Sequence, residues 1–147
     1  MREILFRGKC KDTGKWYKGQ YIHLHRTTYC FKEDYERDKD NDIHQIVFEE
    51  MMDWGLPNRH LRVDVIPETV EQYTGLTDKN GTKIFEGDII NGYYSNGEKY
   101  IENSVVEWSN LFIAWNVNKH VSLFGRGYCY YEVIGNIHDN PELLKGE

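Results

Sequence analysis

Turn-forming residues recur at short intervals along this 147-residue chain, and the runs between them alternate apolar with polar side chains. The clearest run spans residues 16–24, where Tyr17, Tyr21 and His23 share one side of a period of two, which is typical of a β-strand. Many short strands at close spacing predict a mainly β fold, either a small barrel or a β-roll. We expect a β-hairpin within residues 3–32 and strands near 27–31, 43–48, 63–66, 100–108, 111–117 and 129–137.

The connections between these runs carry their own signals. Residues 32–42 are almost all charged and predict an exposed loop. Asn140 followed by Pro141 is typical of a helix start, so a short helical turn is expected near the C-terminus. Sharp reversals of the chain, where glycine is favoured by a positive φ, explain a set of glycine, asparagine and aspartate residues. These predicted turn positions are Gly14, Gly75, Asn80, Gly81, Gly87 and Asp88.

Aromatic side chains dominate the apolar content of the chain. Only 39% of residues are hydrophobic, yet the chain has 4 Trp, 11 Tyr and 6 Phe. A single small core cannot bury so many rings, and Tyr and Trp are the residues that dominate protein interfaces. The alternative is that these aromatic rings simply fill the core of the protein and the rim around it. The candidate interaction surface comprises Tyr93, Tyr94, Trp108, Trp115, Tyr128 and Tyr130.

The charge is unevenly distributed along the chain. Its formal net charge is -6, which argues against general coating of nucleic acid, but residues 1–32 carry a net +6 and the remainder -12. The favoured interpretation is that the basic segment packs on the acidic remainder of the chain or is simply a solvated face; the alternative is a contact surface for a nucleic acid or an acidic partner.

Eight blocks of the sequence carry a family resemblance, namely Arg2–Gly8, Gly14–Trp16, Gly19–Tyr21, Gln72–Leu76, Asp78–Gly81, Ile84–Ile90, Glu132–Ile137 and Asn140–Leu144. They resemble the YopX-like family of small bacteriophage and prophage proteins. The resemblance covers nearly the whole chain and implies an SH3-type barrel within a single domain spanning residues 1–147, with a basic hairpin at 1–32 and a barrel core at about 63–140. It implies no established activity and no catalytic residue.

Two patterns could hold a metal ion. Asp38, Asp40, Asp42 and Glu49 have the spacing of an EF-hand loop, but Ile43 replaces the glycine that the sharp turn requires, so calcium is not expected.

His23 and His25 lie two residues apart and therefore share one face of a strand. Two imidazoles make half a zinc site, which His44, His60 or a cysteine would have to complete. The favoured interpretation is that both are ordinary surface or half-buried histidines, and no resident metal or cofactor is expected.

The favoured function is a non-enzymatic protein–protein interaction module that forms a homo-oligomer in the cytoplasm of a bacterial host. The alternative is a nucleic-acid-binding module that uses the basic N-terminal segment. No apolar run is long enough to span a membrane, and no nucleophile motif or phosphate-binding loop is found. The odd, widely spaced set Cys10, Cys30 and Cys129 predicts reduced thiols.

Overall fold

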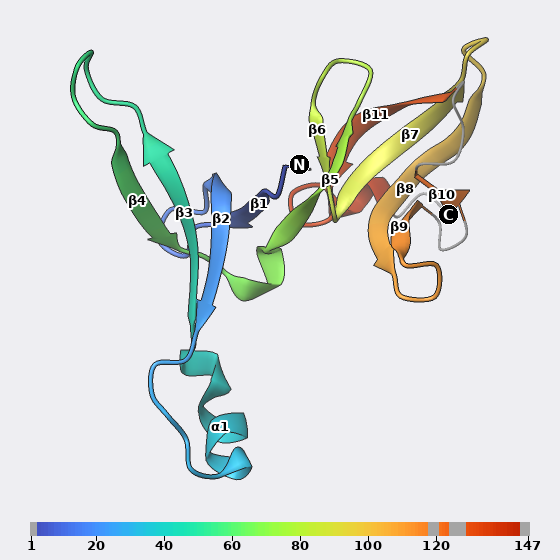
Figure 1. Cartoon of the computed structure of the whole chain (residues 1–147). Coiled ribbons are helices and arrows are strands. Elements are labelled where there is room, and N and C mark those ends of the chain that lie inside the picture. Colours follow the sequence, from blue (N-terminus) through green and yellow to red (C-terminus); the bar gives the residue numbers. More distant parts are fainter. Residues whose placement is uncertain (1–2, 118–120, 124–128, 145–147) are drawn as a thin grey trace. The chain divides into compact units, whose positions relative to one another are not determined.

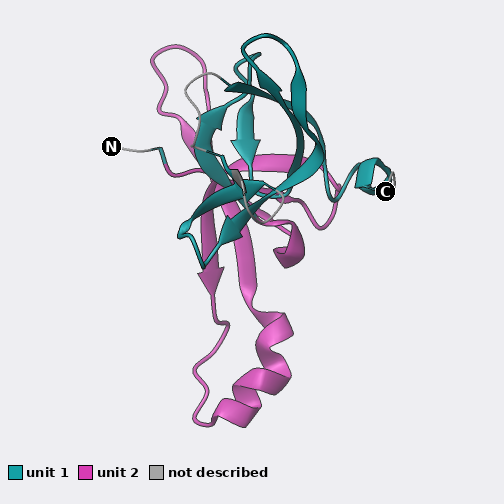
Figure 2. Cartoon of the chain, turned by 90° about the vertical axis from the view of Figure 1, so that its right-hand side faces the viewer, with its two compact units in different colours: residues 1–3, 71–147 teal, residues 4–70 magenta. Residues whose placement is uncertain are grey.

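The chain divides after Val70 into two compact units, shown in Figure 2. Unit 1 comprises residues 71–147 with the first three residues, and unit 2 comprises residues 4–70. The computed structural model describes residues 3–117, 121–123 and 129–144. Both units consist chiefly of antiparallel strands, which confirms the predicted mainly β fold.

Unit 2 is an antiparallel sheet with a helical excursion. Its strands follow the order β4-β3-β2-β1, and the long connection between β2 and β3 carries its only α-helix among the described residues (Figure 1). The predicted N-terminal hairpin is present as the pair β1–β2. The elements are β1 (Phe6–Lys9), β2 (Trp16–Leu24), α1 (Lys32–Asp38), η1 (Lys39–Asn41), β3 (Ile43–Glu50), β4 (Arg59–Asp64) and η2 (Pro67–Thr69).

Alternation along β2 gives the sheet of unit 2 two different faces. Tyr21 lies opposite the fully buried Ile46 of β3, so the face they share contains part of the core. Val65, next to β4, is also fully buried and bridges to Cys10. The opposite face presents Trp16 among basic side chains of β1 and β2.

Residues 32–41 form the helices α1 and η1, so the prediction of a loop over residues 32–42 was wrong. Opposite charges one turn apart explain the helix: Arg37 pairs with Asp34 at 3.0 Å, and Lys39 pairs with Glu36 at 3.3 Å. Residues 27–31, predicted as a strand, contain no strand and lead into α1 instead.

Unit 1 contains a five-stranded antiparallel sheet of order β10-β9-β8-β7-β11, and the hairpin β5–β6 (Figure 1). The described strands do not close into a barrel, so the SH3-type barrel implied by the resemblance is not formed by this part of the chain. The predicted C-terminal helical turn is present as η3. The elements are β5 (Glu71–Thr77), β6 (Lys83–Phe85), β7 (Asp88–Tyr94), β8 (Lys99–Ser109), β9 (Ala114–Val117), β10 (Val121–Ser122), β11 (Cys129–Asn136) and η3 (Pro141–Leu144).

The core of unit 1 combines aliphatic residues with two aromatic rings from the sheet. Leu76, Tyr100 and Val133 pack on its margin. Burial of these side chains is the main stabilising contribution to this unit. The buried members are Ile84, Ile90, Ile101, Val106, Trp115, Val117, Leu123 and Tyr131.

Two aspartates fix the central turns of unit 1. Asp78 accepts the backbone N–H groups of Asn80 and Thr82 through Oδ1, at 2.8 and 2.9 Å, and so forms an Asx turn. Asp88 accepts the N–H of Phe85 at 2.7 Å and thereby closes the β6–β7 reversal. The predicted turn glycines Gly14, Gly75, Gly81 and Gly87 all have positive φ.

We predict that Gly87→Ala destabilises unit 1 by clearly more than Gly97→Ala. Both glycines have positive φ, so each substitution costs about 1 kcal/mol in backbone strain. At Gly87 an added Cβ would also meet Oε1 of the buried Glu71 at 2.1 Å, whereas nothing lies within 4 Å at Gly97. Denaturant unfolding of the two variants provides the measurement, and equal losses would contradict the proposed clash.

Candidate functional site

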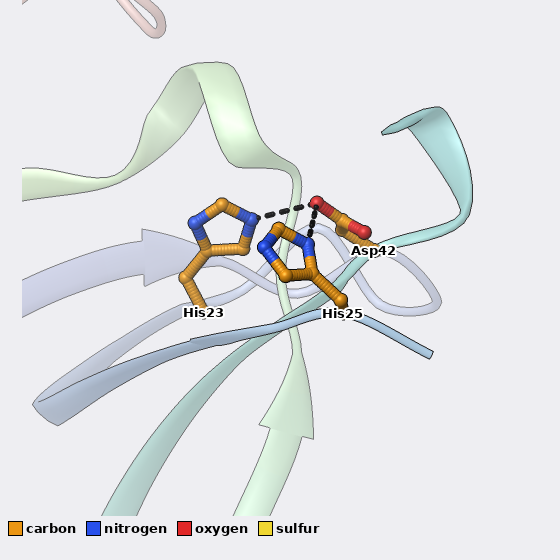
Figure 3. A group of neighbouring side chains, drawn as sticks. All are labelled: His23, His25 and Asp42. Atoms are coloured by element: carbon orange, nitrogen blue, oxygen red, sulfur yellow. Dashed lines mark hydrogen bonds and ion pairs between the residues drawn. The ribbon is translucent and has the colours of Figure 1, made fainter. Parts of the chain in front are cut away.

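The strongest cluster of chemically active side chains lies where the β2–β3 connection leaves and re-enters the sheet of unit 2. His23 is near the end of β2, and His25 follows that strand. Asp42 immediately precedes β3, so the sheet pairing brings it close to both histidines. Figure 3 shows the two imidazole rings directed at the carboxylate.

One carboxylate oxygen receives all the contacts in this cluster. Nε2 of His23 lies 2.9 Å from Oδ2 of Asp42, and Nδ1 of His25 lies 3.0 Å from the same oxygen. The hydroxyl of Tyr35, on α1, donates to it at 3.5 Å. The other oxygen, Oδ1, is buried and has no hydrogen-bond partner among the described residues.

Asp42 is a buried charge. Its exposed fraction is only 5%. The hydrogen bond from His23 holds the pKa of Asp42 below its usual value, and His25 acts in the same direction, although burial opposes both. The carboxylate is therefore ionised at neutral pH, and the two imidazoles compensate a charge that would be costly to bury alone.

Contacts with His44, and through it with Tyr21, fix the orientation of the His23 ring. Its ring stacks on that of His44, its cross-strand neighbour in β3, with centroids 4.4 Å apart and planes 16° apart. The Tyr21 hydroxyl lies 2.6 Å from Nδ1 of His44 and donates to it in the neutral Nε2–H tautomer of that histidine. Burial lowers the pKa of His44, and the adjacent His23 lowers it further.

The cluster is accessible from a pocket of about 390 Å³ in unit 2. His25 borders a second pocket of about 670 Å³, formed by the segment that precedes α1. Tyr35 lines both pockets. Besides His23, Asp42 and Tyr35, the first pocket is lined by Lys11, Lys39, Asp40, His44, Pro67 and Glu68.

The structure brings together a different set of possible metal ligands from the one that the sequence suggested. His23 and His25 share a site as expected, but the third member is Asp42 rather than His44, His60 or a cysteine. His60 contacts Glu49 on the β3–β4 pair, so neither residue belongs to the cluster, and Glu49 is not grouped with Asp42 as the EF-hand spacing requires. The thiols of Cys10, Cys30 and Cys129 are all free.

The described members of the predicted aromatic surface lie in different surroundings within unit 1. Tyr93 and Tyr130 are cross-strand partners whose rings stack with centroids 5.2 Å apart, and Lys79 lies over both. Tyr94 stacks on Tyr100 at the margin of the core. Tyr128 lies outside the described residues.

The two tryptophans of the predicted surface differ in exposure. Trp108 is 41% exposed and packs edge-to-face on Trp115, its cross-strand neighbour. Trp115 belongs to the core of unit 1 and offers almost no surface to a partner.

Large apolar side chains protrude instead from two strand connections, a feature that the sequence analysis missed. The β3–β4 connection exposes Met51, Trp54 and Leu56, and the β8–β9 connection exposes residues 111–113. A Met-Met-x-Trp run before a Gly-x-Pro turn was the available signal. No helix in the described part of the chain is long and apolar enough to cross a bilayer.

We predict that acidification from pH 7.5 to 5.5 destabilises the wild-type protein more than it destabilises His44→Gln. The folded state holds the pKa of His44 below its ordinary value of about 6.5, so the unfolded chain binds the proton first as pH falls. The stability from neutral His44 is therefore present above that value and lost below it. Denaturant unfolding at the two pH values measures the difference, and an identical pH dependence would contradict the assignment.

Comparisons with known proteins identify the family. The crystal structure of protein EF1440 from Enterococcus faecalis is similar over 98% of this chain and 99% of that chain, with 25% sequence identity and a TM-score of 0.48. A search of curated proteins found no match. The YopX protein family matches residues 5–145, nearly the full length, as the sequence blocks suggested. The chain belongs to the YopX family.

Proposed function

We propose that this protein is a non-enzymatic interaction module that associates with a second copy of itself through the apolar tip of the β3–β4 connection. We define the apolar tip as Met51, Trp54 and Leu56, whose exposed fractions are 86%, 101% and 57%. The observation that carries the proposal is the complete exposure of the Trp54 ring. Tryptophan is enriched among residues that dominate binding energy at protein interfaces.

The local backbone holds Trp54 in this exposed position. The N–H of Leu56 donates to the carbonyl of Asp53 at 3.0 Å, which closes a turn around Trp54. Gly55 completes that turn with a φ of +83°. A ring presented by a closed turn loses less conformational entropy on binding than a ring on an unstructured loop.

The β8–β9 connection of unit 1 also exposes large apolar side chains. Leu111 and Ile113 are strongly exposed, and Ile113 has a φ of +51°. A left-handed conformation at a β-branched residue costs about 1–2 kcal/mol, so this connection sustains strain while it exposes apolar side chains. A second apolar tip supports association between copies, because subunit interfaces are the usual way to remove such side chains from water.

The cellular setting is part of the proposal. Similarity to the YopX-like family implies a bacteriophage or prophage protein, and we place its action in the cytoplasm of a bacterial host. The three free cysteines agree with a reducing compartment. No cofactor is required for an interaction role.

One face of the β1–β2 hairpin favours the alternative function, binding of nucleic acid. Arg7 lies directly opposite Lys18, and Lys9 lies opposite Trp16. The Arg7 guanidinium and the Lys9 ammonium lie 5.0 and 5.7 Å from the centre of the Trp16 ring. Basic side chains around an aromatic ring are typical of surfaces that contact phosphates and bases.

We predict that the wild-type protein has a mass above 17.5 kDa by light scattering and that Met51→Ser with Trp54→Ser shifts it toward 17.5 kDa. Ile4→Ser is the matched control, because Ile4 is also exposed, at 54%, but lies outside the apolar tip. A wild-type monomer, or a mass unchanged in the double variant, would contradict the proposal.

The nucleic-acid alternative predicts a different behaviour. A wild-type monomer would bind DNA with an affinity that falls steeply with salt, with a log–log slope of about -0.9 for each phosphate contacted. Lys18→Gln would then reduce the magnitude of the slope by about 1. Fluorescence anisotropy at several salt concentrations measures it, and the absence of DNA binding at low salt would exclude this alternative.

A further inference from the structure

We propose that His23, His25 and Asp42 form a binding site for one divalent transition-metal ion, with Zn²⁺ as the best match. Two imidazole nitrogens and one carboxylate oxygen are a ligand set that zinc uses in proteins. A set of oxygen ligands alone would favour calcium or magnesium, whereas imidazoles favour zinc, copper, nickel or iron. The site is independent of the proposed self-association.

The distances from the two imidazole nitrogens to the carboxylate oxygen fit a small ion. The three ligand atoms all lie within 4.8 Å of one another, and both nitrogens are about 3 Å from Oδ2 of Asp42. Zinc bonds of about 2.0–2.1 Å in a tetrahedron place ligand atoms about 3.3 Å apart. Each nitrogen–oxygen separation therefore needs to change by only a few tenths of an ångström.

The hydrogen bonding of Asp42 also favours a cation site. Both histidines converge on Oδ2, while the buried Oδ1 has no hydrogen-bond partner in the described part of the chain. A buried carboxylate oxygen without a partner is rare and costly. A cation between the three side chains would replace the two N–H···O hydrogen bonds and could also be reached by Oδ1 through a small rotation of the carboxylate.

Metal binding would require a change of tautomer at both rings. His23 Nε2 and His25 Nδ1 must carry protons to hydrogen-bond the carboxylate, but they must offer lone pairs to a metal. Each proton would then move to the other ring nitrogen or to solvent. Nδ1 of His23 and Nε2 of His25 would become the N–H groups.

The surroundings support a three-ligand site with an open position. Stacking on His44, which Tyr21 holds, fixes the ring of His23. Such outer contacts orient metal ligands. The pocket beside the cluster leaves room for water as the fourth ligand. The titratable groups around that pocket carry both signs, with positive charge on Lys11 and Lys39 and negative charge on Asp40 and Glu68, together with Tyr35 and His44.

The position of the site gives the ion a structural consequence. His25 and Asp42 flank residues 26–41, which include α1 and η1. An ion bound to both would close this connection at its base and restrain α1 against the end of β2 and β3. Metal binding is therefore expected to raise the melting temperature of the folded protein.

The test uses the full chain, stripped with a chelator and titrated with ZnCl₂ in a calorimeter, followed by elemental analysis after desalting. We expect one zinc ion per chain and a rise in melting temperature. In a parallel titration, Co²⁺ at the same site should show the visible absorption of a four-coordinate complex. His25→Ala should weaken zinc binding by at least about 100-fold.

His60→Ala is the matched control, because His60 is an exposed histidine paired with a carboxylate outside the cluster. It should bind zinc as the wild type does. His25 is itself half exposed, so its variant should keep the fold, which circular dichroism verifies, whereas Asp42→Asn removes a buried charge and serves only as a second variant. No stoichiometric zinc, or equal binding by His25→Ala and wild type, would overturn the proposal.

Discussion

The fold of unit 2 depends on the stabilisation of one buried negative charge, the carboxylate of Asp42. An isolated carboxylate would not stay ionised at such burial, so the chain must supply donors, and it does so from the end of the neighbouring strand. The pairing of β2 with β3 sets this geometry, because it brings His23 opposite His44 and leaves Asp42 within reach of both His23 and His25. The hydrogen bonds of Asp42 with His23 and His25 thus link the two ends of the connection that carries α1.

The two features that we connect with function lie at opposite ends of β3. Asp42 precedes that strand, and the apolar tip follows it. At about 3.3 Å per residue, the eight residues of β3 separate the two features by roughly 25 Å. Changes at Trp54 should therefore leave the histidine cluster unaffected, so metal binding and self-association can be tested one at a time.

The sequence predicted those parts of the molecule that depend on local periodicity. Alternation along residues 16–24 identified β2 and placed His23 and His25 on one face, and Asn80-Gly81 predicted the turn between β5 and β6, although not the part that Asp78 has in it. It missed α1, because a run of charges resembles a loop unless the pairs one turn apart are counted.

The contribution of Asp42 could not be predicted, since strand register brings together residues that are distant in sequence. The same holds for Trp115: its burial depends on what packs over the sheet and not on its own alternation. The open sheet of unit 1 likewise follows from strand pairing, which no local pattern specifies.

The protonation of the two imidazoles tests the central claim most directly, because an ionised, buried Asp42 can only accept hydrogen bonds. A long-range ¹H–¹⁵N correlation spectrum of the metal-free protein at pH 8 distinguishes the two ring nitrogens of each histidine. We predict the Nε2–H tautomer for His23 and the Nδ1–H tautomer for His25, since those nitrogens face Oδ2. The opposite tautomers, or the averaged signals of unstructured histidines, would contradict it.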